Sequence, residues 1–246
     1  FIGNPYLQDT ELTNYDLRYE FFFAPQQHFT AGLFYKDLDK PVESIVIEQG
    51  ATIQQSYLNA PAARLYGAEA EIRKTFIDPL SGLWWIGGKD IFFQANYTWS
   101  DSEVRVRSGD VVFPISGAGS PAPASNFIGD GTRLQGQSEH VANLQIGWED
   151  FEADSQGTFI ATYVSERSSA RGRPGEPDYT QEPGVMLDFV YRKKFERWGR
   201  PFSFSFKAQN ILDEDYFEYQ RFGGGEVIIN QYDLGRAYSV GLSTSF

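Results

Sequence analysis

The chain has 246 residues and a formal net charge of −12, with 33 acidic and 21 basic side chains and no cysteine. This charge argues against nucleic acid as the main partner, and the lack of cysteine excludes thiol catalysis, cysteine-based zinc sites and disulfides. Mean hydropathy is −0.40, and no stretch of about 18 apolar residues occurs, which excludes helical membrane spans. Barrel strands escape this test, because only every second residue meets lipid.

Nine segments alternate between apolar and polar residues with a period of two, which predicts strands with one oily and one polar face. In the first segment, for example, Leu17 and Tyr19 alternate with Arg18 and Glu20. Aromatic residues make up 16% of the chain and occupy many of the apolar positions. The predicted strands are 11–24, 27–40, 63–76, 89–104, 137–150, 156–169, 182–195, 201–213 and 236–246.

The length of these segments separates two all-β architectures. Strands of soluble proteins usually have about 5–6 residues, whereas a membrane strand needs about 9–11. Several segments are longer than either value, and charged residues such as Glu69, Glu71 and Arg73 share one face. A wet barrel interior and a lipid exterior explain that pattern better than a soluble β-sandwich does. The predicted fold is therefore a segment of an antiparallel transmembrane β-barrel.

The connections alternate between short and long, as bacterial barrels alternate periplasmic turns with extracellular loops. On this basis the last strand runs toward the periplasm and the first begins outside. Complete bacterial barrels usually have an even strand number with both ends inside, so we expect further strands, and another domain, before Phe1. The short connections are 25–27, 77–88, 150–156 and 196–200, and the long ones are 41–62, 105–136, 170–181 and 214–235.

Short motifs in a consistent order resemble the C-terminal half of the barrel of TonB-dependent receptors. The strongest is Asn210-Ile211-Leu212-Asp213-Glu214-Asp215-Tyr216, which leads to Gly235-Arg236-Ala237-Tyr238 and the terminal Phe246. Gly67-Ala68-Glu69-Ala70-Glu71 is similar to the family's Gly-x-Glu-x-Glu strand. Asn4-Pro5-Tyr6-Leu7 and Asn14-Tyr15-Asp16-Leu17 resemble an earlier strand opening, although Gln8-Asp9-Thr10-Glu11 departs from the family's Pro-Glu pair.

The resemblance implies the architecture and the biological role. The family's barrel has about 22 strands around a plug, so residues 1–246 would be its C-terminal portion, with the plug, the earlier strands and the TonB-contacting segment outside this chain. The implied protein is a non-enzymatic receptor in the outer membrane of a Gram-negative bacterium. It would capture a scarce solute, first a ferric siderophore and then cobalamin or oligosaccharides, and import it with TonB-coupled energy. Implied partners are outer-membrane lipid, lipopolysaccharide, the TonB complex and the barrel assembly machinery.

Candidate functional residues lie in the long loops and in the last strand. Arginine and tyrosine side chains on rigid scaffolds suit an anionic or aromatic ligand. The last strand, through Tyr238, Val240, Leu242 and Phe246, forms the membrane-insertion signal that the resemblance implies. Asn210 and Asp213 are interpreted as structural groups at a strand exit. The candidate ligand residues are Arg133, Arg171, Arg173, Tyr179, Tyr219, Arg221, Phe222 and Tyr232.

Three other functions remain open at this stage: a passive pore, a barrel hydrolase using His140, and a soluble β-sandwich lectin. The triple glycine 223–225 lacks the Lys-Ser/Thr of a phosphate loop, which argues against nucleotide binding. The two histidines, His28 and His140, have no second histidine at ligand spacing, and the acidic loops lack calcium-loop spacing. We therefore expect no metal and no cofactor.

Overall fold

The computed structural model describes residues 1–49, 52–82 and 87–244, and this part of the chain is almost entirely β-structure. No helix among these residues has the length and apolar character to cross a membrane. The main strands are β1 (Glu11–Ala24), β2 (Gln27–Asp39), β5 (Ala62–Phe76), β6 (Asp90–Arg105), β9 (His140–Asp150), β10 (Ser155–Val164), β13 (Gly184–Arg197), β14 (Arg200–Gln209) and β17 (Ala237–Thr244).

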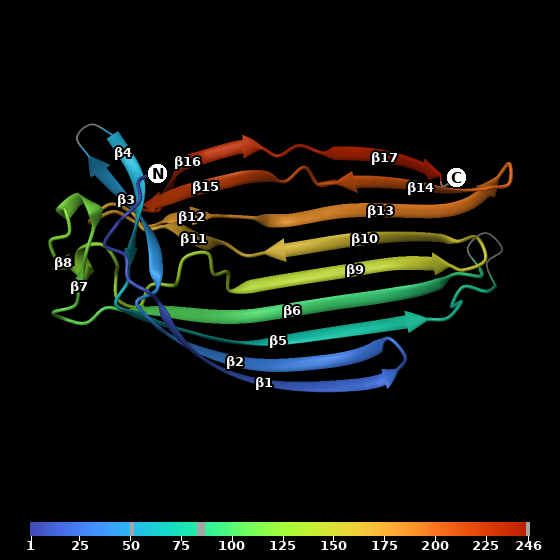
Figure 1. The fold of residues 1–246 in the computed structure, drawn as a ribbon, viewed down its shortest axis with the longest axis horizontal. Coiled ribbons are helices and arrows are strands. Elements are labelled where there is room, and N and C mark those ends of the chain that lie inside the picture. The colour runs from blue at the N-terminus through green and yellow to red at the C-terminus, as the bar shows by residue number, and fades with distance from the viewer. Residues whose placement is uncertain (50–51, 83–86, 245–246) are drawn as a thin grey trace.

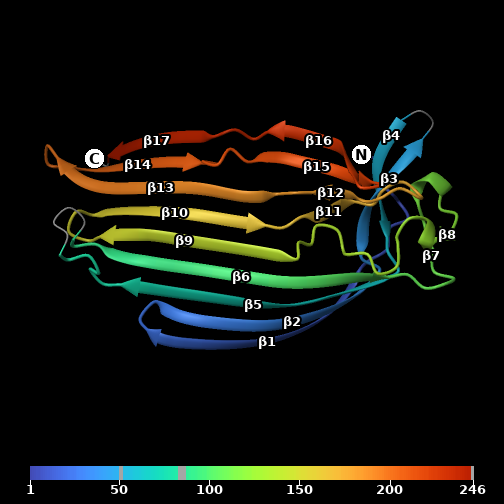
Figure 2. The same ribbon diagram turned by 180° about the vertical axis from the view of Figure 1, so that it is seen from behind.

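These main strands form one antiparallel sheet in the order β1-β2-β5-β6-β9-β10-β13-β14-β17. Each is one of the nine segments expected from the sequence, so the predicted barrel wall is confirmed. Figure 1 shows the sheet with the turns and the C-terminus at one end and the long connections and the N-terminus at the other. The reverse view in Figure 2 shows the same arrangement, with β1 and β17 as the two open edges.

The strand register joins the apolar residues of all nine strands into one continuous face. One row runs from Phe21 across Phe29, Ile72, Ala95, Leu144 and Ala161 to Leu187. Leu17 and Leu33, which pair across β1 and β2, are 70% and 58% exposed. Burying one large apolar side chain contributes about 1.5–3 kcal/mol, so a face of this extent requires hydrocarbon contact. This is the lipid-facing side of a transmembrane barrel wall.

The opposite, inner face carries polar side chains that bond to one another across strands. His28 Nε2 lies 2.9 Å from Glu71 Oε1. Further along the wall, Asn143 donates a 2.8 Å bond to Asn96, and Thr162 donates a 3.0 Å bond to Asn143. Such ladders satisfy polar groups on a sheet and fit a solvated lumen.

Glycine allows close approach at two points of the sheet. A Cβ atom at Gly67 would collide with the Phe34 ring and with the Trp99 carbonyl oxygen. At Gly157 on the lipid face, the space that a side chain would take is filled by the Trp148 ring. An aromatic ring that covers a glycine on the neighbouring strand pins the register of the sheet.

Eight shorter strands lie in the extracellular connections, seven of them where the sequence interpretation placed only loops. β3 (Val42–Gln49) and β4 (Thr52–Asn59) form a hairpin, and β7 (Val111–Val112) pairs with β8 (Ala122–Pro123). β11 (Arg167–Ala170), β12 (Tyr179–Gln181), β15 (Asp215–Phe222) and β16 (Gly225–Asp233) form a four-stranded sheet. Two short 3₁₀ helices, η1 (Ile115–Gly117) and η2 (Ala124–Asn126), complete the connections.

Three predicted strand boundaries are wrong. The segment 137–150 becomes a strand only at His140, and 156–169 divides into β10 and β11. The segment 201–213 ends at Gln209, because Asn210 and Asp213 adopt positive φ angles of 52° and 62° that no β-strand accommodates. Beyond this break the hairpin resumes as β15 and β16, so 214–235 is an ordered strand extension with glycines 223 and 224 at its tip.

Candidate solute-binding cap

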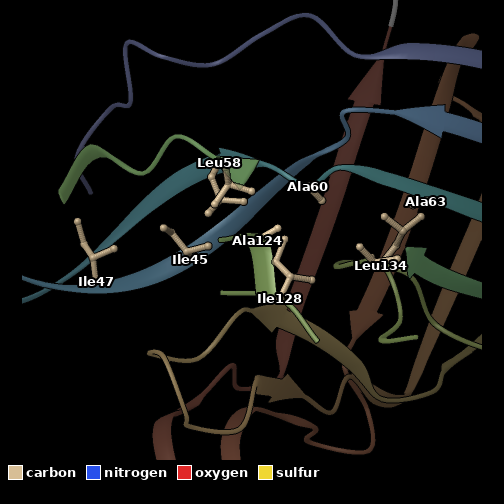
Figure 3. Close-up of a cluster of buried hydrophobic side chains, with 10 residues drawn as sticks. Ile45, Ile47, Leu58, Ala60, Ala63, Ala124, Ile128 and Leu134 are labelled. Carbon is tan, nitrogen blue, oxygen red and sulfur yellow. The ribbon is translucent and has the colours of Figure 1, made fainter. Parts of the chain in front are cut away.

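The extracellular connections fold together into a cap with its own hydrophobic core. Ile45 and Leu58 from the β3–β4 hairpin are fully buried against Val112, Ala124 and Ile128 from the connection 105–136. Figure 3 shows Ile45, Leu58, Ala124 and Ile128 gathered near the start of the strand that carries Ala63. A packed core of this kind holds loops in one arrangement, so the cap offers a fixed surface above the barrel wall.

Arg171 is the polar centre of this cap. Its side chain is 1% exposed, and its guanidinium lies 2.7 Å from Glu43 Oε2, which is equally buried. It also donates to Asp178 Oδ2 at 2.5 Å and to the Arg133 carbonyl oxygen at 2.6 Å. Burial raises the pKa of the Glu43 carboxyl, and the Arg171 charge opposes this effect. One guanidinium thus joins three separate connections.

Backbone bonds fix the same junction. Arg171 N donates to the Ser44 carbonyl oxygen, and Val46 N donates to the Arg171 carbonyl oxygen, both at 2.9 Å. The N-terminal segment is tied to the cap as well, since the Asn4 amide donates to the carbonyl oxygens of Tyr57 (2.7 Å) and Phe113 (2.8 Å). Asn4 therefore clamps two connections that are distant in sequence.

Two of the candidate arginines lie at the surface of the cap with carboxylate partners. Arg133 contacts Glu139 at 2.6 Å and lowers the pKa of that carboxyl through their hydrogen bond. Arg173 contacts Glu176 at 2.6 Å and Glu48 at 3.1 Å. The side chains of Arg133 and Arg173 are 44% and 34% exposed, so both reach solvent.

The β15–β16 hairpin holds four other candidates in different surroundings. Tyr219 is buried, donates to Glu166 at 2.8 Å and accepts from Arg221 at 2.9 Å. Burial, followed by the Glu166 hydrogen bond, raises the pKa of Tyr219 to about 12. Phe222 and Tyr232 are exposed, and Tyr232 stacks on Tyr216 with ring centroids 4.6 Å apart.

Tyr179, the remaining candidate, is half-buried at the start of β12, and desolvation raises its pKa. The structure thus separates the eight candidates into two groups. Arg171 and Tyr219 hold connections together from buried positions. The second group presents atoms to the extracellular solvent and comprises Arg133, Arg173, Arg221, Phe222 and Tyr232. Tyr179 is intermediate in burial and belongs to neither group.

The two C-terminal motifs of the sequence meet in space as one cross-strand clasp. The Asn210 amide donates to the carbonyl oxygens of Glu214 (2.9 Å) and Gly235 (3.0 Å), and its Oδ1 accepts from Glu214 N at 2.8 Å. Arg236 reaches back to Asp213 at 3.3 Å and to the Ile211 carbonyl oxygen at 3.1 Å. The structural role expected of Asn210 and Asp213 follows directly from these contacts.

The residues of the expected insertion signal lie on the lipid face of β17. Tyr238, Val240 and Leu242 pair with Ala208, Phe206 and Phe204 of β14, in the register of the apolar face. All three are largely exposed on the edge strand. Phe246 lies outside the described residues, and the insertion role stays a prediction.

The histidines have partners other than a serine nucleophile. His140 Nδ1 lies 2.8 Å from the Tyr97 hydroxyl at the outer end of the wall, and His140 Nε2 lies 3.8 Å from Glu139. His28 bonds Glu71 on the inner face. Within residues 1–49, 52–82 and 87–244, no group of three or more His, Asp or Glu side chains has the arrangement of a metal site.

The sequence interpretation missed Glu43, Gln135 and Asn4 as organisers of the cap. Gln135 Oε1 accepts from Ser44 N at 2.6 Å beside the Glu43–Arg171 pair. A signal was present, because the run Ser44-Ile45-Val46-Ile47 follows a proline and is rich in β-branched residues. That run lacks alternation, since both of its faces are covered inside the cap.

Fold and surface chemistry together define one class of protein: a transmembrane β-barrel wall with short periplasmic turns and a folded extracellular cap. The family model described as "TonB dependent receptor-like, beta-barrel" matches residues 1–211. The chain therefore belongs to the TonB-dependent receptor β-barrel family, whose members are outer-membrane transporters of Gram-negative bacteria. A comparison with curated proteins gives no match.

Proposed function

We propose that this protein is a receptor that captures a scarce solute, most specifically a ferric siderophore, at the cell surface and imports it with energy delivered through TonB. The observation that carries the proposal is the ordered extracellular cap on a barrel wall of this family. A passive pore has little use for a rigid capture surface, whereas a receptor needs preorganised contacts to bind a dilute ligand.

The solvent-facing candidates supply the ligand contacts in this proposal. Arg173, Arg133 and Arg221 offer guanidinium donors to anionic groups, and Phe222 and Tyr232 offer exposed rings. Arg171 and Tyr219 hold the connections that carry these residues. The plug and the TonB-contacting segment belong to the longer protein in this account. Membrane lipid, lipopolysaccharide and the assembly machinery, which reads the last strand, complete its partners.

Uptake of radiolabelled iron by cells that carry the complete gene tests the proposal. Cells lacking the gene, or lacking TonB, should lose accumulation of the iron from a panel of ferric siderophores. The Arg173→Gln and Arg221→Gln variants should reduce uptake at limiting solute while leaving the amount of folded receptor unchanged. Uptake that persists without TonB would identify a pore. Labelling of a serine by a covalent hydrolase probe would identify an enzyme.

A further inference from the structure

Charged side chains on the lipid-facing side of the wall differ in sign between its two ends. Every second residue of a strand lies on this side, and the register identifies the basic ones. Lys74 pairs with Phe93, and Lys193 pairs with Phe204, both in rows of the apolar face. The turns at this end of the sheet are the periplasmic ones (Figure 1). We define the basic rim as the lipid-side cations beside these turns: Lys74, Lys89, Lys193, Arg197 and Arg200.

One carboxylate accompanies these cations on the lipid side. It belongs to Asp150, the last residue of β9, and lies 3.5 Å from Lys89 Nζ. The other strand carboxylates at this end fall on the inner face by the same alternation: Asp90, Glu149 and Glu196. Three more belong to the turns, beyond the strand ends: Asp78, Glu152 and Asp154. In the part of the chain that the structure describes, the lipid side of the periplasmic end is therefore basic.

The extracellular end of the same side has the opposite sign. Arg64 and Arg105 are its strand cations, and each is paired with a carboxylate of a neighbouring strand. Arg64 donates to Glu103 Oε2 at 2.5 Å, and Arg105 donates to Asp37. Five acidic residues lie on the lipid side of the strands at this end: Glu11, Asp37, Asp39, Asp101 and Glu103. The basic rim is thus a local feature of one membrane boundary in a chain whose net charge is −12.

Aromatic rings accompany the cations of the rim. Lys74 Nζ lies 5.2 Å from the centre of the Phe23 ring and 5.8 Å from that of Phe76. The guanidinium carbon of Arg197 lies 5.3 Å from the ring centre of Trp198, a side chain that is 82% exposed. Aromatic girdles mark the two boundaries of the hydrocarbon in membrane barrels, and long basic side chains there extend their charged groups to the lipid headgroups. The rim therefore lies at headgroup level.

The strands that carry the central cations have neighbours on both sides within this chain. β5 lies between β2 and β6, and β13 lies between β10 and β14. Further strands beside β1 or β17 would not cover the lipid side of β5 or β13, and anything inside the lumen lies on the other side of the sheet. The groups that adjoin Lys74 and Lys193 are therefore those of the membrane.

We propose that the basic rim binds the phosphate groups of anionic phospholipids in the periplasmic leaflet of the outer membrane. Ammonium and guanidinium groups donate charge-assisted hydrogen bonds to phosphate oxygens, and basic clusters beside membrane-spanning segments attract anionic headgroups. The inference concerns the lipid side of the wall. It goes beyond the proposed import function and does not depend on it.

A fluorophore on the S155C variant of the full-length protein measures the lipid composition beside the rim, because Ser155 pairs with Lys193 on the lipid side. The protein is placed in phosphatidylcholine vesicles with a minor fraction of a nitroxide-bearing quencher lipid, either phosphatidylglycerol or phosphatidylcholine. One basic residue near a headgroup contributes on the order of 1 kcal/mol, which is about fivefold in an equilibrium. At low salt the phosphatidylglycerol quencher should therefore be enriched about fivefold at the label, and high salt should reduce this enrichment by screening.

Two triple variants in the S155C background separate the rim from a general effect of charge. K74Q/K193Q/R197Q removes three cations of the rim and should abolish the enrichment. R73Q/R192Q/K194Q is the matched control, since it removes three cations from the inner face of the same two strands, and it should keep the enrichment. Heat-modifiable gel migration confirms that each variant is folded.

Equal quenching by the two lipids before any cation is removed would overturn the proposal. Full enrichment in K74Q/K193Q/R197Q, or an equal loss in the inner-face control, would also overturn it, because the rim would then not be the binding site. Enrichment that high salt leaves unchanged would exclude a charge-based contact. The measurement uses neither uptake nor TonB, so its result is independent of the test of the import proposal.

Discussion

Replacing Arg171 by methionine tests whether the extracellular cap is held by its buried ion cluster. The substitution keeps an unbranched side chain of similar length but removes the guanidinium donors from Arg171 to Glu43, Asp178 and the Arg133 carbonyl oxygen. Asp178 is 30% exposed and can regain water, whereas Glu43 is 1% exposed and cannot. The main cost is therefore an uncompensated carboxylate in the cap core.

Breaking a buried ion pair by removing one partner costs about 3–5 kcal/mol. Because about 1.4 kcal/mol corresponds to a tenfold change in an equilibrium, local opening of the cap should become roughly 100- to 4000-fold more frequent. The double variant E43M/R171M removes both charges and fills the space with apolar groups. It should recover most of the loss, since apolar replacement of a whole buried pair is often neutral.

Limited proteolysis of the full-length protein in detergent measures this opening, because cleavage follows the population of the open form when closing is fast. Cleavage within 170–181 should accelerate strongly in R171M and return toward the wild-type rate in E43M/R171M. Heat-modifiable migration should not change, because the nine wall strands are joined by their own backbone ladder. Equal cleavage of R171M and wild type, or no recovery in the double variant, would refute the assigned role of Arg171.

Three further perturbations test other parts of the account. Asn210→Gly removes the three side-chain hydrogen bonds of the clasp and should lower the free energy of unfolding by about 3 kcal/mol. Asn210→Ala should lower it by about 1 kcal/mol more, because alanine is strained at a φ of 52°. Equal denaturation midpoints for the two variants would argue against that strain. The environment of Tyr219 raises its pKa from 10.0 to about 12, so the protonated hydroxyl contributes fully to stability below pH 10, and this contribution is lost as the pH rises toward 12. Thermal melts of the full-length Tyr219→Phe variant should no longer show this pH dependence. Gly67→Ala should destabilise the wall by about 1–3 kcal/mol. Adding Phe34→Ala should not restore the loss, because the new Cβ atom at position 67 still collides with the Trp99 carbonyl oxygen. Full restoration would assign the clash to the Phe34 ring alone.

The barrel wall was predictable because every strand meets the same two environments, one on each face. Lipid on one side and water on the other force a period of two, so Leu17 with Arg18 and Leu144 with Gln145 carry the same information. The cap obeys no single period. Ile45, Val46 and Ile47 are all buried, and such a run is indistinguishable by pattern from an ordinary hydrophobic stretch.

The roles of individual cap residues required the tertiary structure. Arg171 and Arg173 are two residues apart and look alike in sequence, yet one is buried among three connections and the other reaches solvent. Sequence gives the chemistry of a guanidinium but not its burial, which depends on Glu43, 128 residues away. The same reason applies to Asn210, where the motif predicted a strand exit and the structure shows a break after which the hairpin continues.

Single cysteines introduced along β9 measure the central claim directly, since residues 1–246 contain no cysteine of their own. Spin labels at positions 141 to 148 of the full-length protein in lipid vesicles should alternate strictly. Labels at Leu144 and Ile146 should collide with oxygen dissolved in the bilayer, and those at Asn143 and Gln145 should collide with a water-soluble nickel complex. Labels that show no alternation, or that are shielded from both reagents at Leu144 and Ile146, would contradict a wall with hydrocarbon on one face and water on the other.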